Sequence, residues 1–131
     1  MEFDAGKPEE QVGKVVVDVA VMVHRELGPG LLESVYEAVL AAEFERRGLN
    51  VRRQVPVKID WRGMHFDEAF RADMILDDCV LLELKCVENL SNAHKKQLLT
   101  YLRLTRIKLG YLLNFSQALM RNGITRTVNN L

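Results

Sequence analysis

The sequence is poor in cysteine, proline and tryptophan, with two, three and one of these among 131 residues. Two cysteines are too few for the disulfide framework of a small secreted domain. Cys79 and Cys86 also lie an odd number of residues apart in one predicted strand, so we expect them on opposite faces of it. They should therefore remain unpaired, as reduced thiols of a cytoplasmic protein.

The sequence also lacks an excess of either charge, because Lys plus Arg and Asp plus Glu both number 18. This balance argues against a protein that coats nucleic acid by bulk charge, although it permits a local basic groove. The three histidines are scattered and show no zinc-binding spacing. No run approaches the roughly 18 apolar residues of a membrane span, and the first residues lack the apolar core of a signal peptide. We expect no contact with a membrane.

Composition and length predict one globular domain. Hydrophobic residues make up 48% of the chain and charged residues 27%, which is typical of a protein with a packed core. A chain of 131 residues suits a single domain. We therefore expect one domain over residues 1–131, with residues 1–8 as a flexible tail.

Hydrophobic periodicity predicts an α/β fold. Apolar residues at helical spacing favour a first helix from Pro8 to Gly28 and a second from about Leu31 to Arg47, and Ser91 or Asn92 is a suitable cap for a third over about 93–104. Strands are expected over residues 51–59, 70–76, 79–87, 111–115 and 124–128, with turns at 61–63 and 77–78. This order predicts a mixed central sheet of four or five strands with the helices packed on its faces.

The strand expected over residues 79–87 carries charge near its centre. Glu83 and Lys85 are two residues apart and leave the same face, while Leu84 leaves the other face and can enter a core. A charge in a covered strand costs several kcal/mol unless a partner holds it. Asp73 on the preceding strand supplies a second acid. Two carboxylates beside a lysine suit a hard divalent cation, with the lysine near a phosphate.

Motifs elsewhere in the chain occur in a specific order with this pair. Residues 30–36 have the pattern Gly-x-x-Glu-x-x-Tyr, and Arg71-Ala72-Asp73, Glu83-Leu84-Lys85, Gln97 and Tyr101 follow. With these motifs the chain from about Val12 to Phe115 resembles the GxxExxY proteins of the PD-(D/E)XK nuclease superfamily, and Gln97 and Tyr101 resemble the Gln-x-x-x-Tyr element of its RecB-like branch. The resemblance implies a restriction-endonuclease-like core that hydrolyses phosphodiester bonds of nucleic acid, DNA in preference to RNA.

The resemblance also implies a metal site with Mg²⁺ or Mn²⁺. Its ligands would be Asp73, Glu83, the backbone carbonyl of Leu84 and a glutamate of the second helix. Lys85 would orient and activate the attacking water or offset charge on the phosphate. Arg71, Gln97 and Tyr101 would support these ligands or bind the substrate.

The identity of the helix glutamate is open between two residues. Glu33 and Glu37 are four apart and share a helix face, and we favour Glu37 as the ligand with Glu33 behind it. Both also lie in the first two turns, where the helix dipole stabilises acids without any catalytic role.

Alternatives without catalysis also fit the sequence. Arg71, Asp73, Glu83 and Lys85 can form a structural ion-pair network across neighbouring strands, and the stripe of Gln97 and Tyr101 can be an ordinary helix surface. The whole domain can then be a catalytically inactive nuclease-fold module that binds nucleic acid or protein. A cluster of basic residues near the third helix suits a nucleic-acid backbone or a solvated face: Lys95, Lys96, Arg103, Arg106 and Lys108. A chain this short offers little surface for duplex DNA, so a homodimer or a partner protein is expected.

Overall fold

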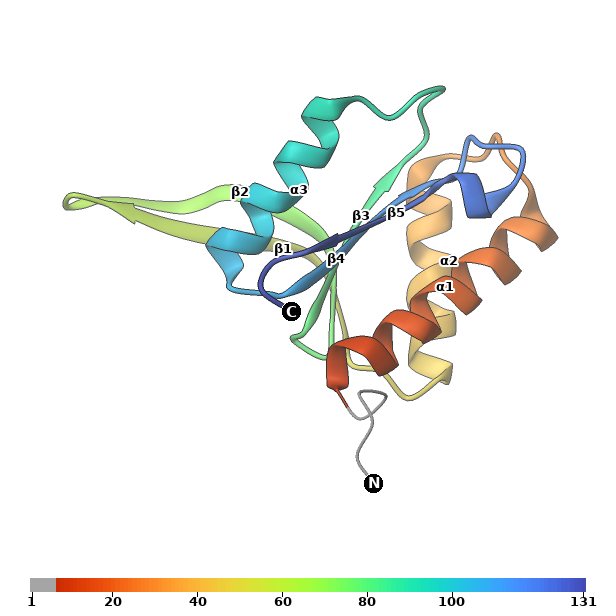
Figure 1. Ribbon diagram of the computed structural model, residues 1–131, viewed down its shortest axis with the longest axis horizontal. Coiled ribbons are helices and arrows are strands. Elements are labelled where there is room, and N and C mark those ends of the chain that lie inside the picture. The colour runs from red at the N-terminus through yellow and green to blue at the C-terminus, as the bar shows by residue number, and fades with distance from the viewer. Residues whose placement is uncertain (1–6) are drawn as a thin grey trace.

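The computed structural model describes residues 7–131, which form three α-helices, five strands and a short 3-10 helix (Figure 1). In chain order these are α1 Pro8–Leu27, α2 Glu33–Arg46, β1 Val51–Trp61, β2 Met64–Leu76, β3 Val80–Lys85, α3 Asn92–Thr105, β4 Leu109–Asn114, η2 Met120–Asn122 and β5 Ile124–Val128. The predicted order of elements is confirmed.

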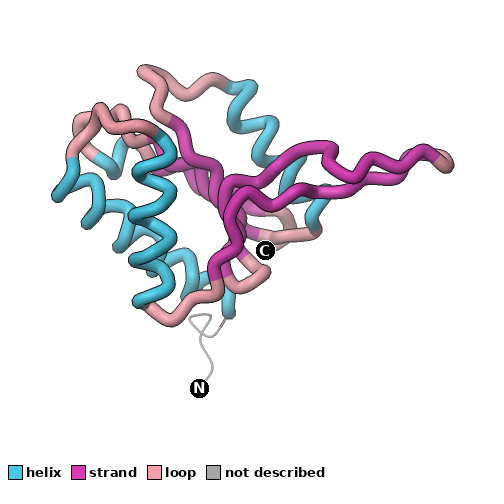
Figure 2. The backbone as a smooth tube through the Cα atoms, turned by 180° about the vertical axis from the view of Figure 1, so that it is seen from behind, coloured by secondary structure: helices cyan, strands magenta, loops and turns pink. Residues whose placement is uncertain are grey.

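The five strands form one mixed sheet in the order β1-β2-β3-β4-β5. β3 and β4 are parallel and are connected through α3, whereas the other neighbouring strands are antiparallel. Helices α1 and α2 cover one face of the sheet and α3 covers the other (Figures 1 and 2). The expected α/β architecture is therefore correct, and β3 is the central strand.

Two apolar clusters follow from the alternation along β3. Leu82 and Leu84 pack into the cluster under α1 and α2, whereas Leu81 packs into the cluster under α3. Glu83 shares the parity of Leu81 and is almost fully buried. The sequence prediction that Glu83 and Leu84 leave opposite faces of a covered strand is confirmed.

The Gly-x-x-Glu-x-x-Tyr segment forms the corner between α1 and α2. Tyr36 is completely buried, and its ring stacks on Phe115 with 4.3 Å between ring centroids. Its hydroxyl donates to the carbonyl of Gly28 and accepts the N–H of Leu31 at 3.2 Å. Tyr36 therefore fixes where α2 begins, and with it the position of the glutamates in its first two turns.

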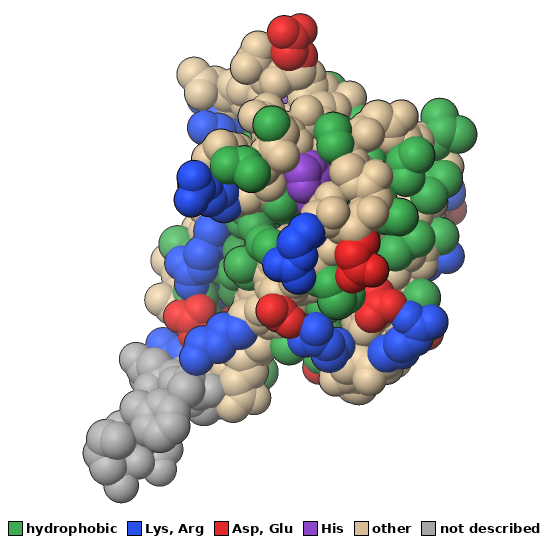
Figure 3. Space-filling model, turned by 90° about the vertical axis from the view of Figure 1, so that its right-hand side faces the viewer, with side chains coloured by type: hydrophobic (Ala, Val, Ile, Leu, Met, Phe, Trp, Pro, Cys, Tyr) green, Lys and Arg blue, Asp and Glu red, His purple; other side chains and the backbone are tan. Residues whose placement is uncertain are grey.

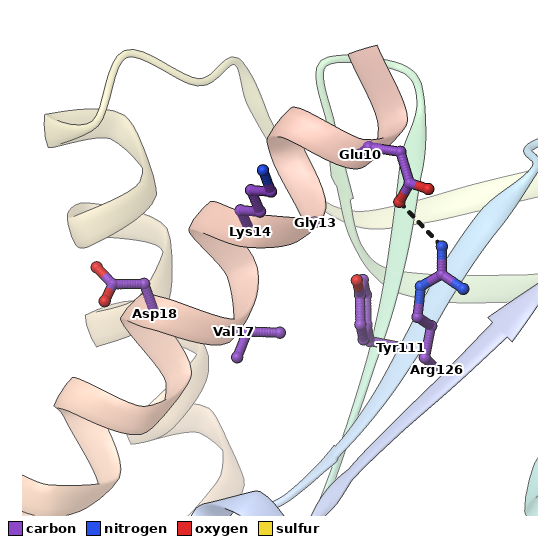
Figure 4. Close-up of a pocket in the computed structure, with 7 residues that line it drawn as sticks. All are labelled: Glu10, Gly13, Lys14, Val17, Asp18, Tyr111 and Arg126. Carbon is purple, nitrogen blue, oxygen red and sulfur yellow. Dashed lines mark hydrogen bonds and ion pairs between the residues drawn. The ribbon is translucent and has the colours of Figure 1, made fainter. Parts of the chain in front are cut away.

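Helix α1 approaches β4 closely because residue 13 is glycine. A Cβ at Gly13 would lie 2.6 Å from the hydroxyl of Tyr111, too close for any larger residue without a shift. Beside this contact is a hollow of about 600 Å³, across which Arg126 donates to Glu10 at 2.9 Å (Figure 4). This hollow lies between α1 and the edge of the sheet, and none of the candidate catalytic residues lines it.

Three expectations need correction. The second strand begins at Met64 and not near Phe70, because residues 64–69 are exposed and show no apolar alternation. The tail expected over residues 1–8 is wrong at Pro8, the first residue of α1, and residues 1–6 lie outside the described residues. Cys79 and Cys86 are free as expected, yet both pack against the cluster under α1 and α2, because both lie just outside β3.

The charges on the surface agree with the balanced composition of the sequence. Acidic and basic side chains lie side by side on much of the face formed by α1 and α2 (Figure 3). Within residues 7–131, no helix combines the length and hydrophobicity needed to cross a membrane.

Candidate active site

The site begins where β2 and β3 separate. Their ladder covers only residues 74–76 and 80–82, so Asp73 and Glu83 are the first residues beyond it. The N–H of Asp73 donates to Glu83 Oε2 at 2.9 Å, and the N–H of Leu84 donates to Asp73 Oδ2 at 2.8 Å. Each carboxylate thus accepts a backbone N–H of the opposite strand through one oxygen. The side chains of Asp73 and Glu83 take the place of the next backbone hydrogen bonds between β2 and β3. They face each other at the point where the two strands separate, which we call the fork.

Burial makes the two charges expensive. Glu83 is only 5% exposed, and burial, followed by the charge of Asp73, raises its pKa to about 8. Burial likewise raises the pKa of Asp73, against the hydrogen bond from Leu84 and the charge of Lys85. The pair therefore favours the uptake of a proton or another positive charge.

The alternative interpretation, a structural ion-pair network across neighbouring strands, is wrong. Arg71 pairs with Glu68 at 2.6 Å on the exposed part of β2. Among the ion pairs within residues 7–131, none involves Asp73, Glu83 or Lys85. Lys85 is partly buried and lowers the pKa of both acids by its charge alone. The acids are therefore not neutralised by a neighbouring side chain.

Both helix glutamates face this pair, but their surroundings differ. Glu37 is buried and accepts hydrogen bonds from Arg53 Nε at 3.0 Å and from Gln54 Nε2 at 2.5 Å. Glu33 is more exposed, and its pKa is raised by partial burial and then by Asp73, while Lys85 lowers it. The charge of Glu33 also contributes to the raised pKa of Glu83. The charge of Glu37 in turn contributes to the raised pKa of Asp73, so both helix glutamates interact with the acid pair, and the choice of Glu37 as the ligand remains a prediction.

Sequence reasoning missed Arg53 and Gln54 as site residues. Gln54 also approaches Asp73, with 3.4 Å between Nε2 and Oδ1, so its amide links the helix acid to the strand acid. Its backbone φ of 50° is left-handed, which is uncommon for a residue other than glycine. This local distortion of β1 has no counterpart in the residue pattern, which only indicated a strand.

Helix α3 brings Tyr101 to the other side of the fork. Its ring stacks on Phe70 of β2, with centroids 3.7 Å apart and planes within 3°. Burial and the charges of Glu83 and Asp73 raise the pKa of its hydroxyl, which therefore lies near both acids. Gln97 is exposed one turn earlier, on a helix that Ser91 caps by accepting the N–H of His94 at 3.2 Å. Tyr101 interacts with the acid pair through charge, and its role in the site, like that of Gln97, remains a prediction.

The basic cluster near α3 divides into two parts. Arg103, Arg106 and Lys108 line a hollow of about 350 Å³ at the C-terminal end of the helix. Lys95 and Lys96 are exposed near its beginning. The cluster therefore has one concave basic region rather than a continuous groove.

The residues at the fork suit a hard divalent cation. Within residues 7–131, no three His, Cys, Asp or Glu side chains are already arranged to hold a metal ion. However, Glu83 is buried and Asp73 is partly buried, burial raises the pKa of both, and each binds the backbone through only one oxygen. Carboxylate oxygens without a basic partner are the donors that Mg²⁺ and Mn²⁺ prefer. The donor set thus fits, with a third acid available on α2.

Comparison with known protein families gives a match that covers nearly the whole chain. The family model described as the PD-(D/E)XK nuclease superfamily matches residues 10–127, from α1 to β5. The matched range includes Asp73, Glu83 and Lys85. No curated protein and no solved structure matches the chain.

Proposed function

We propose that this chain, which belongs to the PD-(D/E)XK nuclease superfamily, is a nuclease that hydrolyses phosphodiester bonds with a divalent metal ion. The observation that supports it best is the facing pair of Asp73 and Glu83 at the fork between β2 and β3. Glu83 is buried and Asp73 partly buried, and neither has a basic ion-pair partner within residues 7–131. Such a pair is costly for folding, so it is expected where a bound cation or a reaction uses it.

The metal site proposed is made of oxygen donors. Mg²⁺ or Mn²⁺ would be held by Asp73, Glu83 and the backbone carbonyl of Leu84, with Glu33 or Glu37 completing the set. When bound, the ion supplies Lewis-acid stabilisation of the phosphate and lowers the pKa of a coordinated water. The contacts favour Glu33 for the remaining position, because both oxygens of Glu37 are engaged by Arg53 and Gln54.

Lys85 is proposed as the catalytic cation. It leaves the same face of β3 as Glu83, and its charge acts on Glu33, Asp73 and Glu83 together. An ammonium group cannot ligate a metal, but it donates hydrogen bonds to a phosphate oxygen or to the attacking water. Fixed charge aimed at the developing negative charge lowers the barrier, and loss of one such group commonly costs about a hundred- to thousandfold in rate.

The substrate proposed is nucleic acid, with DNA preferred to RNA. Within the superfamily, the GxxExxY proteins and the RecB-like branch are the proposed relatives, on the pattern at residues 30–36 and on Gln97 and Tyr101. Arg71 lies at the root of the exposed hairpin, where a substrate can displace it from Glu68. A second copy or a partner protein would extend the small surface that one chain offers to duplex DNA.

The test is cleavage by purified protein with Lys85→Ala beside it. Single- and double-stranded DNA and RNA are incubated with Mg²⁺, Mn²⁺, Ca²⁺ or EDTA, and Lys14→Ala, an exposed lysine on α1, is the matched control. Wild type and the control are expected to cut with Mg²⁺ or Mn²⁺ and not with EDTA, while Lys85→Ala loses about a hundredfold or more. The Mn²⁺-induced rise in Tm should be kept in Lys85→Ala. Equal trace cleavage by all three proteins would indicate contamination and would reject the proposal in favour of a non-catalytic module.

A further inference from the structure

The aromatic residues within residues 7–131 fall into two groups. Four are buried in the core: Tyr36, Phe44, Tyr111 and Phe115. The other four are at least partly exposed: Trp61, Phe66, Phe70 and Tyr101. All of the second group belong to the β1–β2 hairpin or to the residue of α3 that stacks on it. In the part of the chain that the structure describes, exposed rings are therefore confined to the hairpin and its contact with α3.

The hairpin extends away from the body as an arm (Figures 1 and 2). In its register, Val57 pairs with Phe70, and the remaining apolar residues pair nearer to the tip, Ile59 with Phe66 and Trp61 with Met64. Paired residues of antiparallel strands project from the same face. The ladder shifts register between Val57 and Ile59, but the apolar residues keep an even spacing along each strand and so stay on one face. We call this face the arm face, and it consists of Val57, Ile59, Trp61, Met64, Phe66 and Phe70.

The outer part of the arm face is open to solvent. Trp61 is 60% exposed, Met64 56% and Phe66 43%. These residues belong to the outer part of the hairpin, which extends beyond α3 (Figure 1). Apolar residues grouped on an exposed face mark a binding surface more often than residues scattered singly.

The arm face continues into the acid pair. Phe70 at its root belongs to β2, the strand that carries Asp73, and stacks on Tyr101, whose hydroxyl has a pKa raised by burial and by the charges of Glu83 and Asp73. The rings therefore form a series that starts beside the acids and ends at Trp61 near the tip. A chain molecule that reaches the acids along this side must pass over the rings.

We propose that the arm face binds unpaired bases of a single-stranded nucleic acid whose backbone enters the acid pair, an inference that rests on the proposed function. Bases stack on exposed aromatic rings whatever their identity, because every base has a π face. In a duplex these faces are already stacked on one another, so the arm face selects single strands. Arg62 lies over the Trp61 ring at 5.0 Å and Lys58 is exposed on β1. Asp60, Asp67 and Glu68 of the same hairpin are exposed too, so the proposed attraction is base stacking and not net charge.

A second copy of the chain is the competing occupant. Packing of two arm faces would bury Trp61, Met64 and Phe66, but it gives no reason for the ring series to reach Glu83 through Tyr101. The continuity with the acids favours the nucleic acid.

Trp61 is the only tryptophan in the chain, so its fluorescence reports directly on the arm. Wild type is titrated in EDTA with oligothymidylate of about 15 nucleotides, near the upper end of known site sizes, and with a duplex of equal length. Saturable quenching by the single strand is expected, with binding to the duplex weaker by about tenfold or more. A blue shift of Trp61 emission on raising the protein concentration alone, without quenching by the oligonucleotide, would overturn the proposal and indicate a second copy.

Variants separate stacking from simple apolar contact. With a labelled oligothymidylate, Trp61→Phe should keep the affinity, whereas Trp61→Leu and Phe66→Ala should each weaken it about tenfold, because only an aromatic ring stacks on a base. Leu119→Ala, a half-exposed apolar residue away from the arm, is the control and should bind as wild type. Wild-type affinity in Trp61→Leu would overturn the proposal. Since binding is measured without metal, Glu83→Gln should bind normally even though it does not cut, so loss of binding and loss of cleavage are told apart.

Discussion

Asp73 and Glu83 each complete a backbone hydrogen bond at the point where the other's strand leaves the ladder. Glu83 accepts the N–H of Asp73 itself, and Asp73 accepts the N–H of Leu84, the residue after Glu83. The exchange holds two carboxylates face to face, Glu83 buried and Asp73 partly buried, and burial raises the pKa of both. The same contacts that stabilise the fork therefore prepare it for a cation.

Asp73→Asn should abolish the response of the protein to metal. In wild type, Mn²⁺ should raise Tm, because a ligand that binds only the folded state stabilises it. The asparagine side chain still has an oxygen for the N–H of Leu84, so the fork should persist. Without metal the variant should be as stable as wild type or more stable, because one of two facing acids is neutral. Differential scanning calorimetry with and without Mn²⁺ measures both effects.

Asp67→Asn is the matched control, since Asp67 is an exposed acid on the same strand. It should keep the full Mn²⁺ shift. Equal shifts in wild type and Asp73→Asn would place the metal elsewhere.

The raised pKa of Glu83 predicts how the metal-free protein responds to pH. The folded-state pKa is about 8 and the ordinary pKa of a glutamate is 4.5, so the folded state holds a proton that the unfolded state releases between these values. The free energy of unfolding is therefore highest below about pH 4.5 as far as this group is concerned, and it falls as pH rises towards 8. The loss is at most about 1.4 kcal/mol per pH unit for one proton.

Glu83→Gln removes this titration and should flatten the slope. Urea unfolding in EDTA between about pH 5 and 8 gives the difference between the two proteins. A difference that is constant over this range would mean that Glu83 is already ionised in the folded protein.

The sequence was sufficient to predict the main helices and strands, because their hydrophobic patterns reflect which side chains are buried. The alternation along β3 placed Glu83 and Leu84 on opposite faces, and the spacing in α2 placed Glu33 and Glu37 on one. Residues 64–69 are exposed, so no pattern could extend β2 into the arm. The ion pair between Glu37 and Arg53 could not be predicted from the sequence either, because it joins α2 to β1 through a tertiary contact alone.

Glu33→Gln should weaken Mn²⁺ binding more than Glu37→Gln. The charge of Glu33 acts on Glu83 and that of Asp73 acts on Glu33, whereas both oxygens of Glu37 already accept hydrogen bonds from Arg53 and Gln54. Loss of charge from a metal ligand weakens metal binding directly. Loss of a supporting group disturbs the orientation of the ligands, which typically lowers the metal affinity by about ten- to a hundredfold. Isothermal titration with Mn²⁺ measures the order. The reverse order would assign the ligand role to Glu37, and no effect of either would leave both acids to the helix dipole.

Gln54→Gly should separate stability from activity. Gln54 adopts φ 50°, a conformation that costs a residue with a side chain on the order of 1 kcal/mol and costs glycine little. Glycine also makes the unfolded chain more flexible, which offsets the gain, so the free energy of unfolding should change by less than about 1 kcal/mol. The amide that links Glu37 to Asp73 is lost, so the acids are no longer held in register. The cleavage rate should fall about tenfold through kcat, because the effect is on positioning rather than on substrate binding.

Asn130→Gly is the control for the backbone, since Asn130 has a similar φ of 57° and makes none of these contacts. It should leave the cleavage rate unchanged. Gln54→Asn tests the reach of the amide, because asparagine tolerates a positive φ but its shorter stem does not extend to Glu37. Both Gln54 variants should therefore lose activity with little change in urea midpoint. Wild-type kcat in both would show that Glu37 and Asp73 keep their geometry without the amide, and Gln54 would then be only a strained strand residue.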